Sequence, residues 1–247
     1  MIFDIPNIWL FMSALPIVAF LYASVGHGGA SGYLALMALF SFATEAMKPT
    51  ALLLNLFVAG IAFYHYYKAG HFNKKLFGVF AIASIPLAFV GGMIAVDTSV
   101  YKTILGVLLI FAILKMLNVF GKESESIKKV SLWQGLLVGA IIGFFSGLIG
   151  IGGGIILTPV ILLLHWGKMK EAAAVSALFI WVNSAAGLLG QISSGVQINS
   201  EAFILVAIAF IGGFLGSYYG SKKLNNKVLR YILAFVLTIA SVKLIFT

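Results

Sequence analysis

Long apolar runs, separated by short polar loops, follow one another along almost the whole chain. They cover residues 8–42, 50–67, 76–96, 101–118, 131–166, 172–192, 202–221 and 228–246. A helix needs about 20 apolar residues to cross a bilayer once, and the runs 8–42 and 131–166 are nearly twice that length. The pattern therefore predicts a helical protein that crosses a membrane several times, with two runs that each hold more than one helix.

A glycine-rich stretch interrupts each of the two long runs. The stretches are Gly26-His27-Gly28-Gly29-Ala30-Ser31-Gly32 and Gly147-Leu148-Ile149-Gly150-Ile151-Gly152-Gly153-Gly154. Each glycine weakens a helix interior by about 1 kcal/mol relative to alanine, so several together predict a break. We expect two helices in each long run, joined at Gly26–Gly32 and at Gly150–Gly154, with the second helices starting at Ala30 and Ile155.

The two glycine stretches belong to an internal repeat. A shift of about 124 positions aligns Gly26 with Gly150, Gly28 with Gly152 and Gly29 with Gly153. The repeat continues beyond them, where Asn55 falls near Asn183 if a gap of two is allowed. Each half then holds one broken hairpin and three further spans, and because three is odd, the halves face opposite ways in the membrane. We predict a first inverted repeat over residues 1–118, a cytoplasmic linker over 119–130 and a second inverted repeat over 131–247.

The lysines and arginines indicate how each long run lies in the membrane. If each run crossed once, the 16 lysines and arginines would divide evenly, eight on each side. If each run enters and returns to the same side, thirteen lie on one side, with Lys48, Lys102 and Lys243 on the other. Cytoplasmic loops are rich in these residues, so the second arrangement is favoured. It makes each long run a re-entrant hairpin and places both termini outside.

Composition supports this class and excludes others. Hydrophobic residues form 62% of the 247 residues and charged residues 9%, with a mean hydropathy of +1.10, whereas a soluble domain carries about 25% charged residues. The net charge of +9 lies in clusters between apolar runs, so nucleic-acid binding is not indicated. The chain has no cysteine, which excludes disulfides and thiolate chemistry. The predicted fold class is an all-α polytopic membrane protein of two inverted halves, each a broken re-entrant hairpin plus three transmembrane helices, in the cytoplasmic membrane.

The polar chemistry inside the predicted spans is uncharged. Glu45, Asp97, Glu171 and Glu201 fall at or near the ends of runs, where helix caps and interfacial contacts are the default interpretation. A helix that restarts after a glycine break presents free N–H groups and the positive end of its dipole, which suit an anion. The alternative for the glycines is close helix packing, which explains consecutive glycines less well. We interpret the two breaks as an anion site near the membrane midplane.

The candidate substrate-binding residues are those of the breaks together with neutral side chains of nearby spans. They are Gly26, His27, Gly28, Gly29, Asn55, Ser146, Gly150, Gly152, Gly153, Gly154, Ser176, Trp181, Asn183 and Ser184. The two asparagines are the strongest side-chain candidates, because a buried amide is costly in lipid. For each serine alone, a hydrogen bond to a neighbouring helix is the alternative. Histidine is the side chain that ordinarily changes its charge near neutral pH, which makes His27 a candidate carrier of a coupling proton.

The sequence shows no signature of an enzyme. It contains neither H-E-x-x-H nor G-x-S-x-G, and no pair of carboxylates lies in the middle of a span. The spacing of the four histidines does not suggest a metal site. We therefore expect no catalytic residue, no metal and no cofactor.

The second half carries a more specific pattern. Gly143-Phe144-Phe145-Ser146-Gly147-Leu148-Ile149-Gly150-Ile151-Gly152-Gly153-Gly154, Pro159, Ala172-Ala173-Ala174-Val175-Ser176-Ala177-Leu178 and Asn183-Ser184 resemble the TauE/SafE family of sulfite exporters and related anion permeases. The pattern occurs twice, over essentially 15–245, and the first copy departs from it at His27 and Ala30. The resemblance implies a secondary transporter for sulfur-containing anions such as sulfite or sulfoacetate.

These observations predict a permease or exporter that works by alternating access and binds its anion at half-helix N-termini. An uncoupled anion channel of the same architecture and a non-transporting membrane scaffold are the alternatives. The expected partners are a small anionic substrate, a coupling proton and the lipid bilayer, without nucleic acid, and a homodimer is left open.

Overall fold

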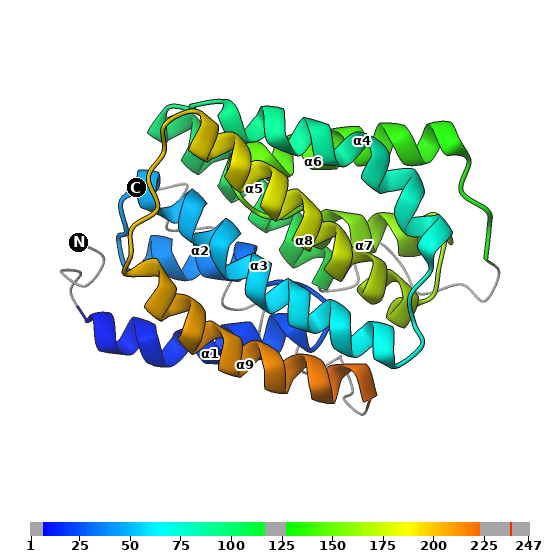
Figure 1. The fold of residues 1–247 in the computed structure, drawn as a ribbon, viewed down its shortest axis with the longest axis horizontal. Coiled ribbons are helices and arrows are strands. Elements are labelled where there is room, and N and C mark those ends of the chain that lie inside the picture. Colours follow the sequence, from blue (N-terminus) through cyan, green and yellow to red (C-terminus); the bar gives the residue numbers. More distant parts are fainter. Residues whose placement is uncertain (1–6, 117–126, 223–237, 239–247) are drawn as a thin grey trace.

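The computed structural model describes residues 7–116, 127–222 and 238, and within them the chain forms α-helices that run roughly along one axis (Figure 1). The helices are α1 (Ile8–Ala23), α2 (Ala30–Leu39), α3 (Thr44–Lys68), α4 (Lys74–Met93), α5 (Thr98–Met116), α6 (Leu132–Ile149), α7 (Gly154–Leu163), α8 (Met169–Ser193) and α9 (Ala202–Lys222). The apolar run 228–246 lies outside the described residues except for Thr238, and so do residues 119–126 of the expected linker.

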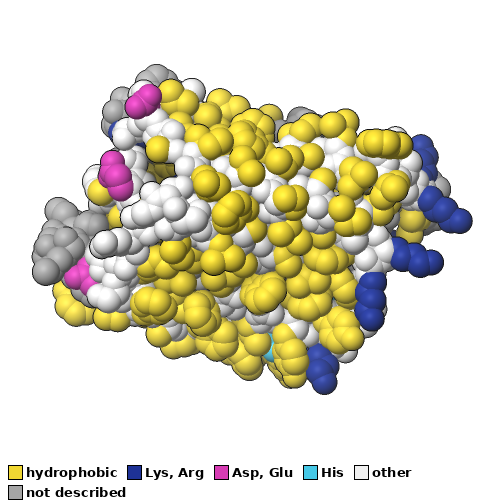
Figure 2. All heavy atoms as spheres, turned by 45° about the horizontal axis from the view of Figure 1, so that its top comes forward, with side chains coloured by type: hydrophobic (Ala, Val, Ile, Leu, Met, Phe, Trp, Pro, Cys, Tyr) yellow, Lys and Arg dark blue, Asp and Glu magenta, His cyan; other side chains and the backbone are white. Residues whose placement is uncertain are grey.

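The protein is a multi-pass membrane protein. In the described part of the chain, α3, α4, α6, α8 and α9 are long and apolar enough to cross a membrane, while α1, α2 and α7 are shorter apolar helices. The face in Figure 2 has a broad hydrophobic surface with lysines gathered at one end and carboxylates at the other. We call these the basic end and the acidic end. The acidic end carries Glu45, Asp97 and Glu201 together with Lys48 and Lys102. The basic end carries lysines at the end of α3 and at the starts of α4 and α8, namely Lys68, Lys74, Lys75, Lys168 and Lys170.

The helix breaks predicted at the glycines are confirmed, and both broken pairs are antiparallel. Phe40, directly after α2, packs on Phe11 near the start of α1, with 5.7 Å between the ring centroids. The N–H of Lys128, before α6, donates to the carbonyl of His165, after α7, at 2.7 Å. Each pair therefore returns to the end at which it began. The second break ends one residue earlier than expected, because α7 starts at Gly154.

Helices α3 and α8 lie at the centre and pack against each other. On one side, α3 contacts α9, which in turn packs on α1. On the other side, α8 contacts α4, which packs on α6. The two sequence halves thus exchange one helix each, since α4 packs on helices of the second half and α9 on helices of the first.

Glycines every fourth residue bring two helix pairs into backbone contact. On α6, Gly139, Gly143 and Gly147 lie against the carbonyls of Phe80, Ser84 and Ala88 of α4. On α9, Gly212 and Gly216 lie against the carbonyls of Pro16 and Phe20 of α1, and Gly220 lies against the carbonyl of Ser24, directly after α1. Small residues at this spacing are typical of close helix packing in lipid. These glycines are explained by packing, and they fix how α4, α6, α1 and α9 are rotated.

Polar side chains define where helices begin at the basic end. The Asn73 side chain accepts from the N–H of Leu76 at 3.0 Å and so caps α4. A capping box of Ser131 and Gln134 begins α6. Glu171, in the first turn of α8, accepts from the N–H of Lys168 at 3.3 Å. These caps satisfy helix N–H groups that otherwise lack a partner, so the helix starts are encoded locally.

Candidate functional site

The first break, residues 24–29, forms a tip between α1 and α2 that we call the first tip. Gly26 and Gly29 have φ values of 76° and 107°, in a left-handed region that costs other residues roughly 1–2 kcal/mol. Gly29 precedes α2 and has no side chain to cap it. The first N–H of the helix, that of Ala30, donates instead to Oδ1 of Asn55 at 3.1 Å. The start of α2 is therefore held by a side chain of α3.

The second break, residues 150–153, forms the second tip, between α6 and α7. Gly150, Gly152 and Gly153 have φ values of 86°, 72° and 78°. Gly153 precedes α7 and likewise has no side chain to accept from its first N–H groups. Uncapped N–H groups at a helix start are suited to an anionic acceptor.

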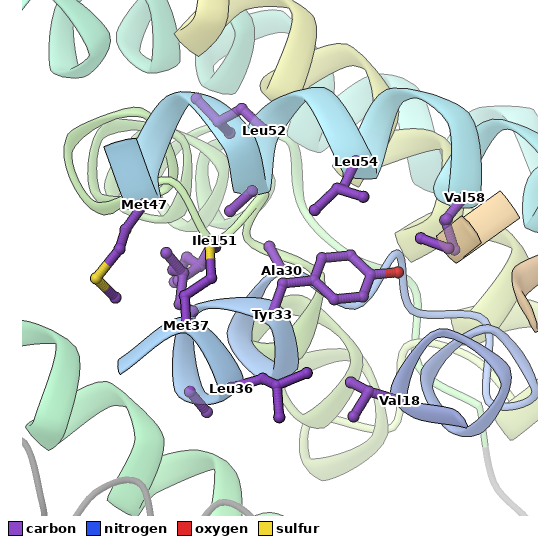
Figure 3. Packing of buried hydrophobic residues seen from close by; sticks show 14 of the residues in the cluster. Val18, Ala30, Tyr33, Leu36, Met37, Met47, Leu52, Leu54, Val58 and Ile151 are labelled. Atoms are coloured by element: carbon purple, nitrogen blue, oxygen red, sulfur yellow. The ribbon is translucent and has the colours of Figure 1, made fainter. Parts of the chain in front are cut away.

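An apolar cluster holds the second tip against the first half of the chain. Ile151 belongs to the same buried cluster as Tyr33 and Met37 of α2 and Met47 and Leu54 of α3 (Figure 3). In lipid, such side chains hold helices together by van der Waals packing rather than by the hydrophobic effect. The second tip is thus fixed by contacts to α2 and α3, far away in the sequence.

Both tips contact the side chains of Asn55 and Ile180. A Cβ on Gly28 would lie 2.6 Å from Oδ1 of Asn55 and 2.9 Å from Cγ2 of Ile180. A Cβ on Gly152 would lie 2.5 Å from Nδ2 of Asn55 and 2.7 Å from Cγ2 of Ile180. Nδ2 of Asn55 also donates to Oγ of Ser184 at 3.1 Å. We call Gly28, Asn55, Gly152, Ile180 and Ser184 the central site.

The central site is buried and uncharged. Asn55 and Ser184 are fully buried, and Ile180 is 2% exposed. The polar groups are backbone amides, one side-chain amide and one hydroxyl, and hydrogen bonds from such donors are strongest when the acceptor is an anion. Among the described residues, no group of three or more His, Asp or Glu side chains could hold a metal ion. The arrangement can therefore bind an oxyanion through neutral donors.

Other predicted residues lie next to the central site. Gly26 packs against Ala173 of α8, and Gly154 packs against Ile180. Ser146 is fully buried and its Cβ lies beside Gly153. The hydroxyl of Thr158 donates to Oγ of Ser176 at 2.8 Å, which joins α7 to α8. For Ser176, the hydrogen bond between helices is the contact that the structure describes.

Three predicted residues lie elsewhere than on the central site. Trp181 is 42% exposed and packs beside Gly60 of α3, so the structure does not bring it to the tips. Asn183 is fully buried, but its Nδ2 donates to a carbonyl of its own helix at 2.7 Å. His27 is buried in the first tip, where its Nδ1 lies 3.1 Å from the carbonyl oxygen of Val25.

The comparison of the two sequence halves missed Ile180, because the match of Asn55 with Asn183 needed a gap. Helix α3 begins at Thr44 and α8 at Met169, 125 positions later. The same offset, without a gap, pairs Asn55 with Ile180, and these are the two side chains that touch both Gly28 and Gly152. The gapped match was wrong, because it aligned two residues of the same type rather than two residues at the same position in their helices. Aligning the two halves by the first residues of these two helices would have paired Asn55 with Ile180.

This chain matches a known protein family and several known proteins. Residues 11–244 match the family described as Sulfite exporter TauE/SafE. The probable membrane transporter protein y4hK of Sinorhizobium fredii is 37% identical over 234 residues, which cover 93% of this chain and 94% of that protein. The probable membrane transporter protein YunE of Bacillus subtilis is 32% identical over 112 residues, 45% of this chain and 41% of that protein.

Another relative is the probable membrane transporter protein MJ0441 of Methanocaldococcus jannaschii. It is 28% identical over 156 residues, 61% of this chain and 58% of that protein. No solved structure matches the chain. Since the family match spans nearly the whole chain, this protein belongs to the TauE/SafE sulfite exporter family, a family of membrane transporters rather than enzymes.

Proposed function

We propose that this protein is a secondary transporter that carries a small sulfur-containing anion, such as sulfite or sulfoacetate, across the cytoplasmic membrane. The observation that carries the proposal is the meeting of the two tips on Asn55. It brings the starts of two half-helices, α2 and α7, to one small polar centre in an otherwise apolar bundle. Broken-helix transporters hold anionic groups at such half-helix N-termini. The choice of a sulfur-containing anion rests on the family.

In the proposed bound state, the anion accepts hydrogen bonds from the starts of α2 and α7 and from the side chains of the central site. Oδ1 of Asn55 accepts from the N–H of Ala30, so an anion oxygen competes with it for this donor. Rotation of the amide then turns Nδ2 towards the anion. Sulfite and sulfonates offer several oxygens to such donors, each in a charge-assisted hydrogen bond. Without the anion, Asn55 accepts from Ala30 and donates to Ser184, and in the proposed bound state its amide donates to the anion.

Alternating access is proposed to arise between two groups of helices. One group holds α1, α2, α3 and α9, and the other α4, α6, α7 and α8, because these helices pack together. The central site lies where α3 meets α8, on the boundary between the groups. The proposed inverted repeat is supported by equivalent contacts, since Gly26 packs on Ala173 and Gly150 packs on Lys48. Two equivalent halves give two equivalent end states, open to opposite sides.

The basic end is proposed to face the cytoplasm, because Lys and Arg are enriched in cytoplasmic loops. The chain has no cysteine, so single cysteines report one position each. We expect Lys75→Cys, exposed at the basic end, to react with a membrane-impermeant thiol reagent only in inside-out vesicles. Ser194→Cys, exposed at the acidic end, should react only in right-side-out vesicles. Labelling of both positions from one side would contradict this orientation.

Counterflow in proteoliposomes tests the proposed function. Vesicles loaded with unlabelled sulfite or sulfoacetate should accumulate the labelled anion transiently, because a carrier exchanges bound substrate faster than it equilibrates empty. Sulfate and acetate serve as comparison anions. A channel would give flux without this transient accumulation. If folded protein moves none of the four anions, the protein is not an anion transporter of this kind.

A further inference from the structure

A cavity of about 540 Å³ lies at the acidic end, beside the second tip. The starts of α3 and α5 and the C-terminal ends of α4, α6 and α8 surround it. Its lining includes Glu45 and Lys48 of α3, Leu148 of α6, and Gln191 of α8. We call this cavity the outer pocket. Because Leu148 comes just before the second tip, the outer pocket adjoins the tip on the side away from the basic end.

Lys48 and Gln191 of the outer pocket lie on the same helices as the central site, closer to the acidic end. Lys48 and Asn55 are seven positions apart on α3, and Gln191 and Ser184 are seven positions apart on α8. Seven residues make nearly two full helical turns, so each pair shares one helix face, roughly 10 Å apart along the axis. Since Asn55 and Ser184 are joined by a hydrogen bond, Lys48 and Gln191 face each other across the outer pocket. Gly150 packs on Lys48 and Gly152 on Asn55, so the second tip spans the distance between the two levels.

The polar groups of the outer pocket are poised for a ligand. Gln191 is 2% exposed, and neither Nε2 nor Oε1 of its amide has a hydrogen-bond partner. A buried amide without partners costs roughly 1–3 kcal/mol for each unsatisfied group. The Lys48 ammonium lies 3.4 Å from the carbonyl oxygens of Gly92 and Ile94. An anion between Lys48 and Gln191 would meet a positive charge and an amide donor.

The equivalent positions at the basic end carry different residues, although a cavity of about 770 Å³ lies at that end too, lined by residues 70–75 and 168–171. The offset of 125 between α3 and α8 pairs Lys48 with Ala173 and Gln191 with Tyr66. Ala173 packs on Gly26, and the buried Tyr66 donates its hydroxyl to the carbonyl of Ser24 at 3.0 Å. Each end thus has a cavity, but the pair of Lys48 and Gln191 occurs only in the outer pocket.

We propose that the outer pocket is a second anion site, which receives a small oxyanion from the acidic end between Lys48 and Gln191 before it reaches the central site. This inference rests on the proposed function. It adds the two residues that bind the anion first and the end of the protein at which the anion enters. The exposed Glu45 also lines the pocket, and its negative charge opposes the anion. Lys48 and Glu45 together set the affinity, so the anion is attracted without being held too tightly to move on.

Protection of a single cysteine at the pocket tests the proposal. Ser194 lines the outer pocket and is exposed. We expect sulfoacetate to protect Ser194→Cys from a membrane-impermeant methanethiosulfonate reagent, while choline at the same concentration does not. We call the sulfoacetate concentration that halves the labelling rate the half-protecting concentration. In the Ser194→Cys background, Lys48→Met should raise it about tenfold or more, because a charged hydrogen-bond donor is removed. Lys48→Arg should restore protection.

Two further variants separate an electrostatic role from a folding defect. Glu45→Gln should lower the half-protecting concentration, a gain that misfolding cannot produce. Lys102→Met is the matched control, because Lys102 lies at the same end on α5 but does not line the pocket, and its half-protecting concentration should stay unchanged. If Glu45→Gln and Lys48→Met shift the half-protecting concentration in the same direction, the proposal is wrong.

The outer site and the proposed function can fail separately. If sulfoacetate is transported but never protects Ser194→Cys, the outer site does not exist and the transport function stands. If sulfoacetate protects the cysteine and no anion is transported, the transport function falls and the outer site stands. Asn55→Leu should keep the protection, because the outer pocket does not include Asn55. Loss of protection in a folded Asn55→Leu protein would overturn the idea of two sites.

Discussion

Replacing Asn55 with leucine is expected to lower the rate of anion transport roughly 10- to 100-fold. Leucine has a similar size but can neither accept from the N–H of Ala30 nor donate to Oγ of Ser184, which Asn55 does at 3.1 Å in both cases. Each buried group left without its partner costs roughly 1–3 kcal/mol, and about 1.4 kcal/mol corresponds to a factor of ten. Initial rates of counterflow, normalised to the amount of folded protein, measure the effect.

Two comparison variants show whether the loss comes from the central site. Asn55→Asp keeps an acceptor for the N–H of Ala30 but places a negative charge where the anion binds, so it should fold well and still transport poorly. Asn183→Ala removes an amide that bonds its own helix, so its effect should be clearly smaller than that of Asn55→Leu. Equal losses in Asn183→Ala and Asn55→Leu would show that the central site has been assigned to the wrong amide.

Replacing Gly152 with alanine is expected to abolish transport and to lower the thermal stability of the purified protein. Gly152 has a φ of 72°, which costs alanine roughly 1–2 kcal/mol. The new Cβ would also lie 2.5 Å from Nδ2 of Asn55 and 3.0 Å from Oγ of Ser184. Overpacking at a buried position adds roughly 1–3 kcal/mol, and here it displaces the side chains that hold the two tips together. Thermal unfolding in detergent and counterflow of the same preparation measure both effects.

Gly195 provides the matched control for this change. It has a φ of 88°, but a Cβ there would meet nothing within 4 Å. Gly195→Ala therefore carries the backbone cost alone, and it should lower stability slightly and leave transport near the wild-type rate. If Gly195→Ala is as damaging as Gly152→Ala, backbone strain rather than contact with Asn55 explains the loss.

The exposed lysines and the glycine breaks could be predicted because their causes are local. Gly150, Gly152 and Gly153 end a helix whatever surrounds them, since their φ values are accessible to glycine and costly to other residues. A lysine between two apolar runs lies at a membrane surface because burying its charge in lipid is costly. The helices on either side of each break followed for the same reason, with α7 starting one residue earlier than expected. By contrast, α3 starts at Thr44 and α8 at Met169, before the apolar runs 50–67 and 172–192.

The sequence by itself determined that the chain is a multi-pass helical membrane protein, where its two long runs break, and where its charges gather. Only the tertiary structure decided that Asn55 meets Ser184 and Ile180, that Trp181 faces away, and that Lys48 and Gln191 share a pocket. The physical reason is that these helices are apolar on every side, so no hydrophobic stripe indicates how each is rotated. Their rotation is set by the glycine contacts of α4 with α6 and of α1 with α9, and by the two tips between α3 and α8. Gly139 lies 59 positions from Phe80, and Gly212 lies 196 positions from Pro16, so these contacts appear only when the helices are packed together.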